Sequence, residues 1–449
     1  MARDHLSFAL SKSHKPKSTT KNGISKFVLS KSQLLYNLSS RLGKMFLIIS
    51  FVFLYAVNAT LGWPIVNLGG LRIVEYVDLA AIIQSGQLCS AKIEFWQFIN
   101  LFQPLSDTCG GFLYGRPLLA FLAISSIPLV WTTPLAVVIG LTSAILLALL
   151  FAGDGQLNKS KFSFAILASF SPGVFLLYER SNFDLLMLIG IVAATYLWKK
   201  GGFYAGLFVI GITAIMKYYT VPLLLLAPLL FARSRKQKVL GFFVSALISV
   251  YAFWDYSRLP GLPGSGYHQF GSAVLPHYFS HIGLDVPRVF LIGFGFLLPV
   301  LVGLWIFRST TKKGNSLILG KGIQFTNINE SVPFITVSII FVTCFFAGLN
   351  YDYRLVFLVI PGVILLQSAT GPRLKLLCLS SSLLLALWGS AGLGSGADFG
   401  SDLARFLLVG LLQLAGDTMV FIWTGVLLGL IARIYIGSDS KNLRMRGAN

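Results

Sequence analysis

The stretch from residue 179 to residue 219 sets the pattern of the whole chain. It opens with Glu179-Arg180-Ser181-Asn182-Phe183-Asp184, continues through the apolar span 185–198 and reaches Lys199-Lys200-Gly201-Gly202. A second apolar span, 203–219, ends in Lys217-Tyr218-Tyr219. Charges in a hydrocarbon-rich chain are costly and are usually kept for a function. The stretch therefore predicts membrane helices with charged groups gathered where they end.

The composition extends this reading to the full chain. Of 449 residues, 55% are hydrophobic and only 12% are charged, and the mean hydropathy is +0.77, which indicates a polytopic membrane protein rather than a soluble one. The run 113–131 starts with Gly115-Arg116-Pro117, and we expect it to be re-entrant or juxtamembrane. The fold class is therefore predicted as all-α, with about 12 transmembrane helices. These spans are expected at 46–62, 133–152, 162–178, 185–198, 203–219, 221–232, 239–254, 289–307, 331–349, 355–369, 374–391 and 416–435.

The distribution of charge orients these spans. With the N-terminus inside and 113–131 not counted as a span, 27 of the 36 Lys and Arg residues fall on the inner side, together with four acids. This agrees with the excess of Lys and Arg in cytoplasmic loops, whereas counting 113–131 as a span would move Lys199, Lys200 and the 233–238 group outside. The net charge of +20 is then explained by topology and anionic lipid, without nucleic acid.

The same topology divides the chain into segments. Residues 1–45 form a basic tail predicted to be disordered and cytoplasmic, residues 46–436 a single transmembrane domain, and residues 437–449 a second cytoplasmic tail. Extracytoplasmic loops are expected at 63–132, with juxtamembrane helices, and at 255–288. Cys89 and Cys109 share the first loop and can form a disulfide if it faces an oxidising compartment, although their spacing alone does not show that they meet.

Four groups of polar residues fall on the outer side. Each also has a simpler explanation: an interfacial helix for the first-loop acids, an internal Arg–acid pair beside Arg180, snorkelling for the lysine, and a mutual pair in the last turn. The groups are Glu75 with Asp78, the hexapeptide with Asn182 and Asp184, Lys217 with Tyr218, and Asp352 with Arg354 in Asn350-Tyr351-Asp352-Tyr353-Arg354.

Metal and nucleotide chemistry have little support. His277 and His281 are four residues apart, but no third ligand completes a metal site. The chain has no Walker loop, HExxH or Cys-x-x-Cys motif. We therefore predict no cofactor, and a divalent metal remains unsupported.

Several of these motifs, in this order, resemble family 87 of the C-type (GT-C) glycosyltransferases, which includes bacterial mannosyltransferases that use polyprenyl-phosphate sugars. The likeness covers about residues 70–360. The chain departs from the family where the first outer loop usually carries an early aspartate, because Arg72 stands there and the nearest acids are Glu75 and Asp78. The segments that carry the likeness are 112–119, which contains Arg116, Ser181 to Leu186, Lys199 to Gly202, Ala205-Gly206, Gly211, Lys217 to Pro222, and Asp352 to Leu355.

The resemblance implies a GT-C-like transferase of a bacterial inner membrane, with its active site outside the cytoplasm. It would transfer a mannose-like hexose or a pentose from a polyprenyl-phosphate donor to a glycolipid or glycan of the cell envelope. Asp78, or else Glu75, is expected to be the general base. Lys217 and Arg354 are expected to bind phosphate, with Tyr218, Asp352 and Arg116 also at the substrate. Asn182 and Asp184 would orient sugar hydroxyls or a cationic partner.

Two other classes of function remain open. One is a transporter or flippase for a lipid-linked or anionic solute, which broken helices near charged groups would suit. Against it, we find no repeated halves, and we expect no acid deep within a span. The other is a membrane scaffold, which would tolerate loss of the charges in all four outer groups.

Overall fold

The computed structural model describes residues 45–56, 77–90, 114–152, 159–179, 181–257, 269–272, 274–281, 286–311, 328–347, 350–368, 373–389 and 403–437. Over these ranges the chain is helical apart from short connections and one antiparallel pair of two-residue strands, β1 (Gln269–Phe270) and β2 (Asn350–Tyr351). The prediction of a helical protein is confirmed for these residues. Glu75, Arg180, Cys109 and nearly all of the two predicted tails lie outside them.

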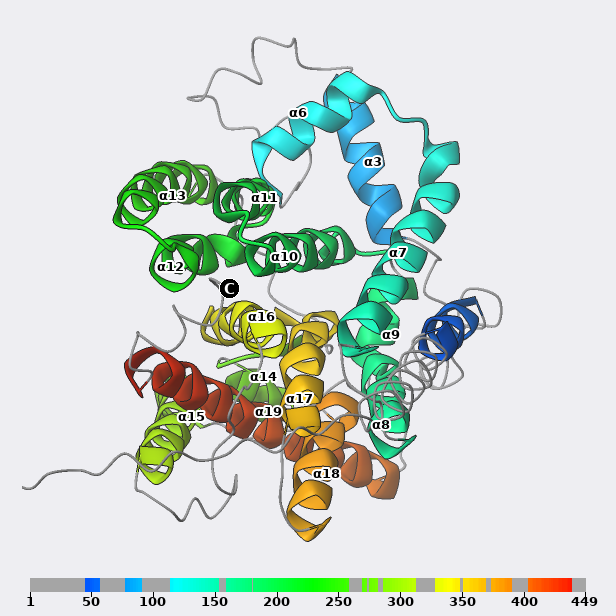
Figure 1. The fold of residues 1–449 in the computed structure, drawn as a ribbon. Helices are drawn as coiled ribbons and strands as arrows, with labels where there is room; N and C mark the ends of the chain where they lie inside the picture. The colour runs from blue at the N-terminus through cyan, green and yellow to red at the C-terminus, as the bar shows by residue number, and fades with distance from the viewer. Residues whose placement is uncertain are drawn as a thin grey trace, which may run out of the picture.

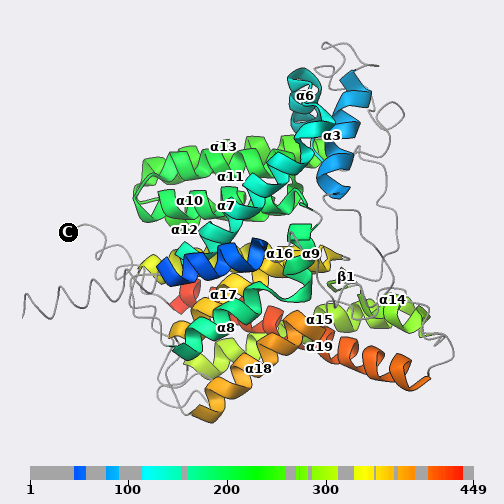
Figure 2. The same ribbon diagram turned by 90° about the vertical axis from the view of Figure 1, so that its right-hand side faces the viewer.

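The helices form two groups that meet along α10 and α16. Helices α10 to α13 lie together in one group, and α15 to α19 in the other (Figures 1 and 2). In chain order the α-helices after residue 76 are α3 (Val77–Ser90), α6 (Arg116–Ser125), α7 (Thr132–Ala152), α8 (Lys159–Ser169), α9 (Pro172–Glu179), α10 (Asp184–Lys199), α11 (Phe203–Met216), α12 (Val221–Phe231), α13 (Arg235–Tyr256), α14 (Val274–His281), α15 (Arg288–Thr311), α16 (Ile328–Phe346), α17 (Val356–Ser368), α18 (Arg373–Gly389) and α19 (Leu403–Gly437). Short 3-10 helices are η1 (Leu129–Trp131), η2 (Tyr218–Thr220) and η3 (Asp352–Leu355).

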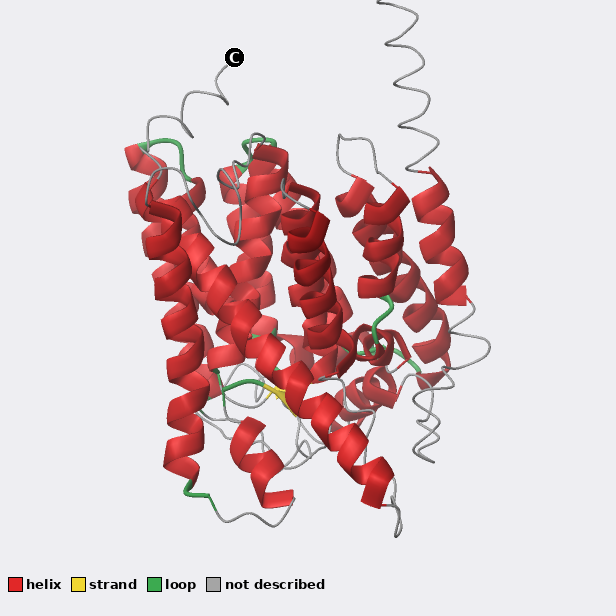
Figure 3. Ribbon diagram, turned by 90° about the horizontal axis from the view of Figure 1, so that it is seen from below, coloured by secondary structure: helices red, strands yellow, loops and turns green. Residues whose placement is uncertain are grey.

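Four helices of the described part are long and apolar enough to cross a membrane: Leu129–Phe151, Arg235–Tyr256, Arg288–Ser309 and Leu411–Ile434. Most helices run side by side along a common direction (Figure 3). Large apolar side chains cover the outer faces of α13 and α15, where Phe253 and Phe290 are 72% and 73% exposed. Soluble monomers rarely expose so much apolar surface, so these faces suit lipid and indicate membrane association.

The structure refines three predicted segments. The expected span 162–178 is two helices, α8 and α9, separated at Phe170-Ser171 because Pro172 has no N–H for a continuous helix. Helix α6, within the run 113–131, has ten residues, about half the length needed to span a bilayer. Helix α19 begins 13 residues before its predicted start at residue 416.

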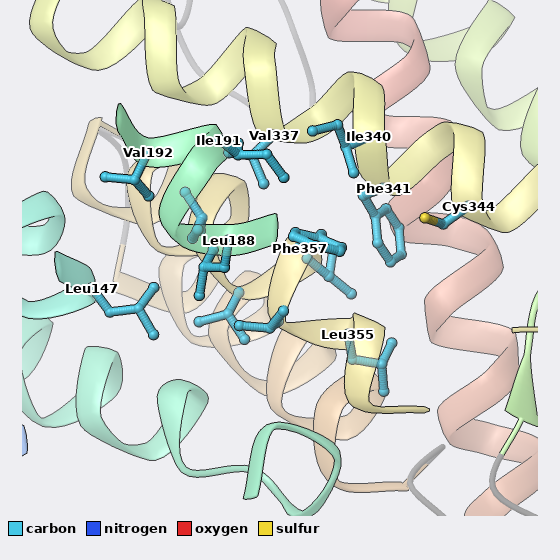
Figure 4. Packing of buried hydrophobic residues seen from close by; sticks show 14 of the residues in the cluster. Leu147, Leu188, Ile191, Val192, Val337, Ile340, Phe341, Cys344, Leu355 and Phe357 are labelled. Carbon is cyan, nitrogen blue, oxygen red and sulfur yellow. The ribbon is translucent and has the colours of Figure 1, made fainter. Parts of the chain in front are cut away.

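The core lies where α10, α16 and α17 meet. Leu188 and Ile191 of α10 face Val337 and Ile340 of α16, with Phe357 of α17 beside them (Figure 4). All five side chains are buried. This packing holds the N-terminal end of α10 close to η3, which directly precedes α17, and so positions the charged groups described next.

Candidate functional site

Five charged side chains are almost fully buried in the part of the chain that the structure describes: Arg116, Asp184, Lys217, Asp255 and Asp417. Ionisable groups inside a membrane protein usually pair with one another and mark functional sites. Four of the five form two ion-paired groups on either side of the break between α11 and α12. We call them the Asp184 cluster (Asn182, Asp184, Lys217, Tyr219 and Arg354) and the Asp255 cluster (Arg116, Tyr218 and Asp255).

Local backbone structure places Asp184 at the start of α10. Beyond α9, Ser181 takes a left-handed conformation with φ of 44°, and its N–H donates to the carbonyl of Tyr178. This reverses the chain, as left-handed residues often do after a helix. The Asn182 Oδ1 then accepts from the backbone N–H of Asp184 at 2.9 Å, a short-range turn that asparagine favours. The hexapeptide is therefore a tight helix–helix corner.

The Asp184 carboxylate forms ion pairs and a hydrogen bond with side chains from two other segments. Lys217 Nζ lies 2.6 Å from Oδ1, and Arg354 Nε lies 3.2 Å from Oδ2. The Tyr219 hydroxyl donates to Oδ1 at 2.6 Å. Lys217 Nζ also donates to Asn182 Oδ1 at 3.3 Å. Arg354 belongs to η3, so one carboxylate joins α10, the α11–α12 break and the turn before α17.

The neighbouring cations favour the ionised form of this carboxylate. Asp184 is completely buried. Burial alone disfavours a carboxylate charge, whereas the Lys217 ammonium and the Arg354 guanidinium stabilise it. The N-terminal end of α10 also favours a negative charge there.

The Asp255 cluster is built in the same way at the end of α13. Arg116 Nε lies 3.0 Å from Asp255 Oδ1, and the backbone N–H of Arg116 donates to Oδ2 at 3.0 Å. The Tyr218 hydroxyl donates to the same Oδ2 at 3.0 Å. The Arg116 guanidinium also lies over the ring of Trp254, at 5.3 Å from its centroid. Arg116 is thus held by an acid and an aromatic face of α13.

The two clusters are joined by the segment before α6. The ring of Tyr114 lies beneath the Lys217 ammonium, with 5.0 Å from Nζ to the ring centroid. The N–H of Gly115 donates to the carbonyl of Met216 at 3.1 Å. A Cβ at residue 115 would collide with the carbonyl oxygen of Ile215, so only glycine allows this approach.

Six of the predicted site residues lie together in these clusters: Arg116, Asn182, Asp184, Lys217, Tyr218 and Arg354. Glu75 is outside the described residues. Asp78 is placed on α3 and Asp352 on η3, but the structure describes only their backbone. The assignment of the base to Asp78 or Glu75 stays a prediction.

The structure decides one alternative that the sequence left open, for Lys217, and shows a partner of Arg354. Lys217 does not snorkel to the interface, because its ammonium is buried against Asp184. Arg354 pairs with Asp184, a residue 170 positions earlier in the chain. Of the two roles expected for Asp184, orienting a cationic partner fits its contacts.

Sequence reasoning missed Asp255, Tyr219 and Asp417. Asp255 directly follows the predicted span 239–254 and was placed in the outer loop, although an acid between two aromatic residues at a helix end was a usable signal. Asp417 is the second residue of the predicted span 416–435, and the longer helix α19 places it further inside. It is buried within the candidate span Leu411–Ile434, and its Oδ1 accepts no hydrogen bond from the residues that the structure describes.

No group of three or more metal-ligating side chains occurs among the described residues. His277 and His281 both lie on α14, and their side chains are outside the description. Comparisons with protein-family models, with curated proteins and with solved structures give no match. The clusters themselves are therefore the basis for the function proposed next.

Proposed function

We propose that the protein is a membrane glycosyltransferase of the GT-C type, with about 12 spans, that transfers a sugar from a polyprenyl-phosphate donor. The observation that carries the proposal is the convergence of Lys217 and Arg354 on one buried carboxylate. A lysine and an arginine brought together from distant segments are the groups that a phosphate needs. The acceptor would be a glycolipid or glycan outside the cytoplasm.

The cations of the Asp184 cluster suit an anionic ligand. Lys217 and Arg354 are held close together on one carboxylate, and the donor carries a phosphodiester with one negative charge. As the sugar leaves, negative charge grows on the phosphate oxygen, and nearby fixed cations stabilise that change.

In the proposed reaction, an acceptor hydroxyl oxygen attacks the anomeric carbon and forms the new glycosidic bond. The bond from that carbon to the phosphate oxygen breaks, and its electron pair leaves with the lipid phosphate. The hydroxyl proton passes to the carboxylate of Asp78 or Glu75. Attack from the side opposite the phosphate inverts the anomeric configuration.

The direct test is sugar transfer and lipid binding with purified protein in detergent or vesicles. Lys217→Ala and Arg354→Ala should weaken binding of polyprenyl phosphate by roughly tenfold or more and lower transfer, because each removes a charge-assisted contact. Lys200→Ala is the matched control, because Lys200 is exposed beyond α10 and stacks on Tyr196. Unchanged affinity in the Lys217 and Arg354 variants would refute the phosphate site.

The base is tested separately with Asp78→Asn and Glu75→Gln. One of them should abolish transfer while leaving lipid binding intact, because a general base acts on the acceptor rather than on the phosphate. If both variants keep full activity, the base is another residue.

One observation favours a second candidate, a transporter or flippase. Asp417 is a buried acid within a candidate span, and the helical path is broken between α8 and α9 and between α11 and α12. Broken helices beside charged groups are typical of transporters. Movement of a lipid-linked substrate across vesicles, without a new glycosidic bond in the product, would favour this candidate over the transferase.

A further inference from the structure

Asp255 is ion-paired with Arg116 through Oδ1 and accepts two hydrogen bonds at Oδ2, and neither oxygen contacts the proposed phosphate ligands Lys217 and Arg354 in these interactions. Its oxygens hold Arg116 through the side chain and the backbone, and they accept from Tyr218. Asp255 is itself buried, with 1% of its surface exposed. Its position raises the question of what a second buried carboxylate does beside the Asp184 cluster.

The side chains of three consecutive residues, Lys217, Tyr218 and Tyr219, contact the two carboxylates alternately. Lys217 and Tyr219 contact Asp184, whereas Tyr218 between them contacts Asp255. Lys217 interrupts the helix with an extended backbone, φ −149° and ψ 110°. Backbone hydrogen bonds still hold this break, from the Lys217 N–H to the Thr213 carbonyl and from the Thr220 N–H to the Lys217 carbonyl. The side-chain contacts add to them by tying the break to the two carboxylates.

Arg116 provides the second connection from Asp255 to Lys217. It directly follows two residues that contact the break. The ring of Tyr114 lies against the Lys217 ammonium, and the N–H of Gly115 donates to the carbonyl of Met216. Asp255 therefore reaches the residues around Lys217 from both sides: through Tyr218 along the chain, and through Arg116 across the Gly115 contact.

We propose that Asp255 is a positioning residue of the phosphate site, fixing the α11–α12 break so that the Lys217 ammonium stays against Asp184. The phosphate part of this inference rests on the proposed function. The geometric part, that Asp255 fixes Lys217, does not depend on any ligand.

The first experiment removes the connection without leaving a buried charge unpaired. Tyr218→Phe deletes the hydroxyl that donates to Asp255, and Tyr256→Phe is the control, because its ring packs on Tyr218 at 5.2 Å and is half exposed. Tyr218→Phe should weaken polyprenyl-phosphate binding by roughly tenfold and raise KM for the donor more than it lowers kcat. Tyr256→Phe should do neither. Equal affinity in both variants overturns the proposal.

The second experiment tests Asp255 itself while allowing for misfolding. Asp255→Asn alone would leave the Arg116 charge buried without its carboxylate and destabilise the fold. Asp255→Leu is therefore combined with Arg116→Met, because apolar replacement of a whole buried ion pair is often neutral for stability. The double variant should unfold at the wild-type temperature yet bind polyprenyl phosphate as weakly as Tyr218→Phe. Asp255→Glu, which keeps the charge, should recover part of the affinity. Wild-type affinity in the double variant means that the pair is only structural.

A third measurement separates this inference from the proposed function. Lys217 and Lys200 are labelled with an amine-reactive reagent, and the modification of each is followed by mass spectrometry. Tyr218→Phe and the Asp255 variants should increase the labelling of Lys217 several-fold relative to Lys200. An unchanged ratio overturns the positioning role. If wild-type protein fails to bind polyprenyl phosphate but the ratio still rises, the proposed function fails and the positioning role stands.

Discussion

Asp184 shows how a single buried residue can hold three parts of the chain. Its two oxygens form ion pairs with Lys217 and Arg354 and accept a hydrogen bond from Tyr219. A buried ion pair contributes little net stability when compared with an apolar replacement, but losing one partner leaves the other charge without compensation. The contribution of Asp184 to stability is therefore judged from the charges that its removal leaves uncompensated, rather than from the strength of any one contact.

Replacing Asp184 with Asn should lower the free energy of unfolding by about 3–5 kcal/mol, because the buried Lys217 ammonium and the partly buried Arg354 guanidinium would lose the carboxylate they share. Tyr219→Phe is the milder comparison, since it removes one hydroxyl that donates to Asp184, and it should cost about 1–3 kcal/mol. Thermal unfolding in detergent would measure both. An Asp184→Asn protein as stable as Tyr219→Phe would contradict this account of the cluster.

Asp417 leads to the opposite expectation. Its Oδ1 is buried without a hydrogen-bond partner among the described residues, and such a group carries an uncompensated desolvation cost. Asp417→Leu should therefore stabilise the protein, by about 1–3 kcal/mol in the same unfolding assay. Lower stability would show that the carboxyl has a favourable partner. Higher stability combined with lost activity would assign the acid a function.

At the scale of elements, α15 and α19 form the most extensive helix pair in the described part of the chain. A Cβ at Gly429 would lie 2.5 Å from the carbonyl oxygen of Gly303 and 2.9 Å from Cβ of Ile306. Small residues allow such backbone contact, and packing of this kind drives helix association inside a membrane.

Gly429→Ala should therefore destabilise the protein by about 1–3 kcal/mol, because the two backbones would have to separate. Gly293→Ala on α15 is the matched control, since a Cβ there meets nothing within 4 Å. That change should be neutral or stabilising, because alanine is the better helix former. Equal unfolding temperatures for the two variants would contradict the packing seen here.

The sequence predicted most of the elements because apolar runs in a membrane protein translate directly into helices. The break before Pro172 was missed, although the proline itself was a signal, because residues 162–178 are uncharged and mostly apolar. For the site, charges in apolar surroundings identified Lys217 and Arg354. Their common partner could not be predicted, because Asp184 and Arg354 are 170 residues apart and only tertiary packing brings them together.

For the whole molecule, the charge distribution predicts which ends of the helices face the cytoplasm. Helix α13 tests this well, since it is one of the four helices long enough to span and has exposed residues at both ends, Lys236 and Ser257. Lys236 belongs to the basic group predicted inside, and Ser257 follows Asp255 on the predicted outer side.

Single cysteines at these two positions, in a protein whose four native cysteines are replaced, would report the orientation. A membrane-impermeant thiol reagent applied to intact cells should label Ser257→Cys and not Lys236→Cys, and both should react after permeabilisation. The reverse pattern would place both clusters on the cytoplasmic side and exclude an extracytoplasmic active site.

The long separation between Asp184 and Arg354 has a consequence for synthesis. A chain emerges and inserts from its N-terminus, so Asp184 enters the membrane well before Arg354 exists. Lys217 follows soon after and can neutralise the acid alone. Nascent chains that end between residues 220 and 350 would thus hold a single Lys–Asp pair, and the arginine would join only when the turn before α17 is made. Completion of the Asp184 cluster is therefore a late event in biogenesis, and Arg354 variants should affect maturation after insertion of α10 and α11.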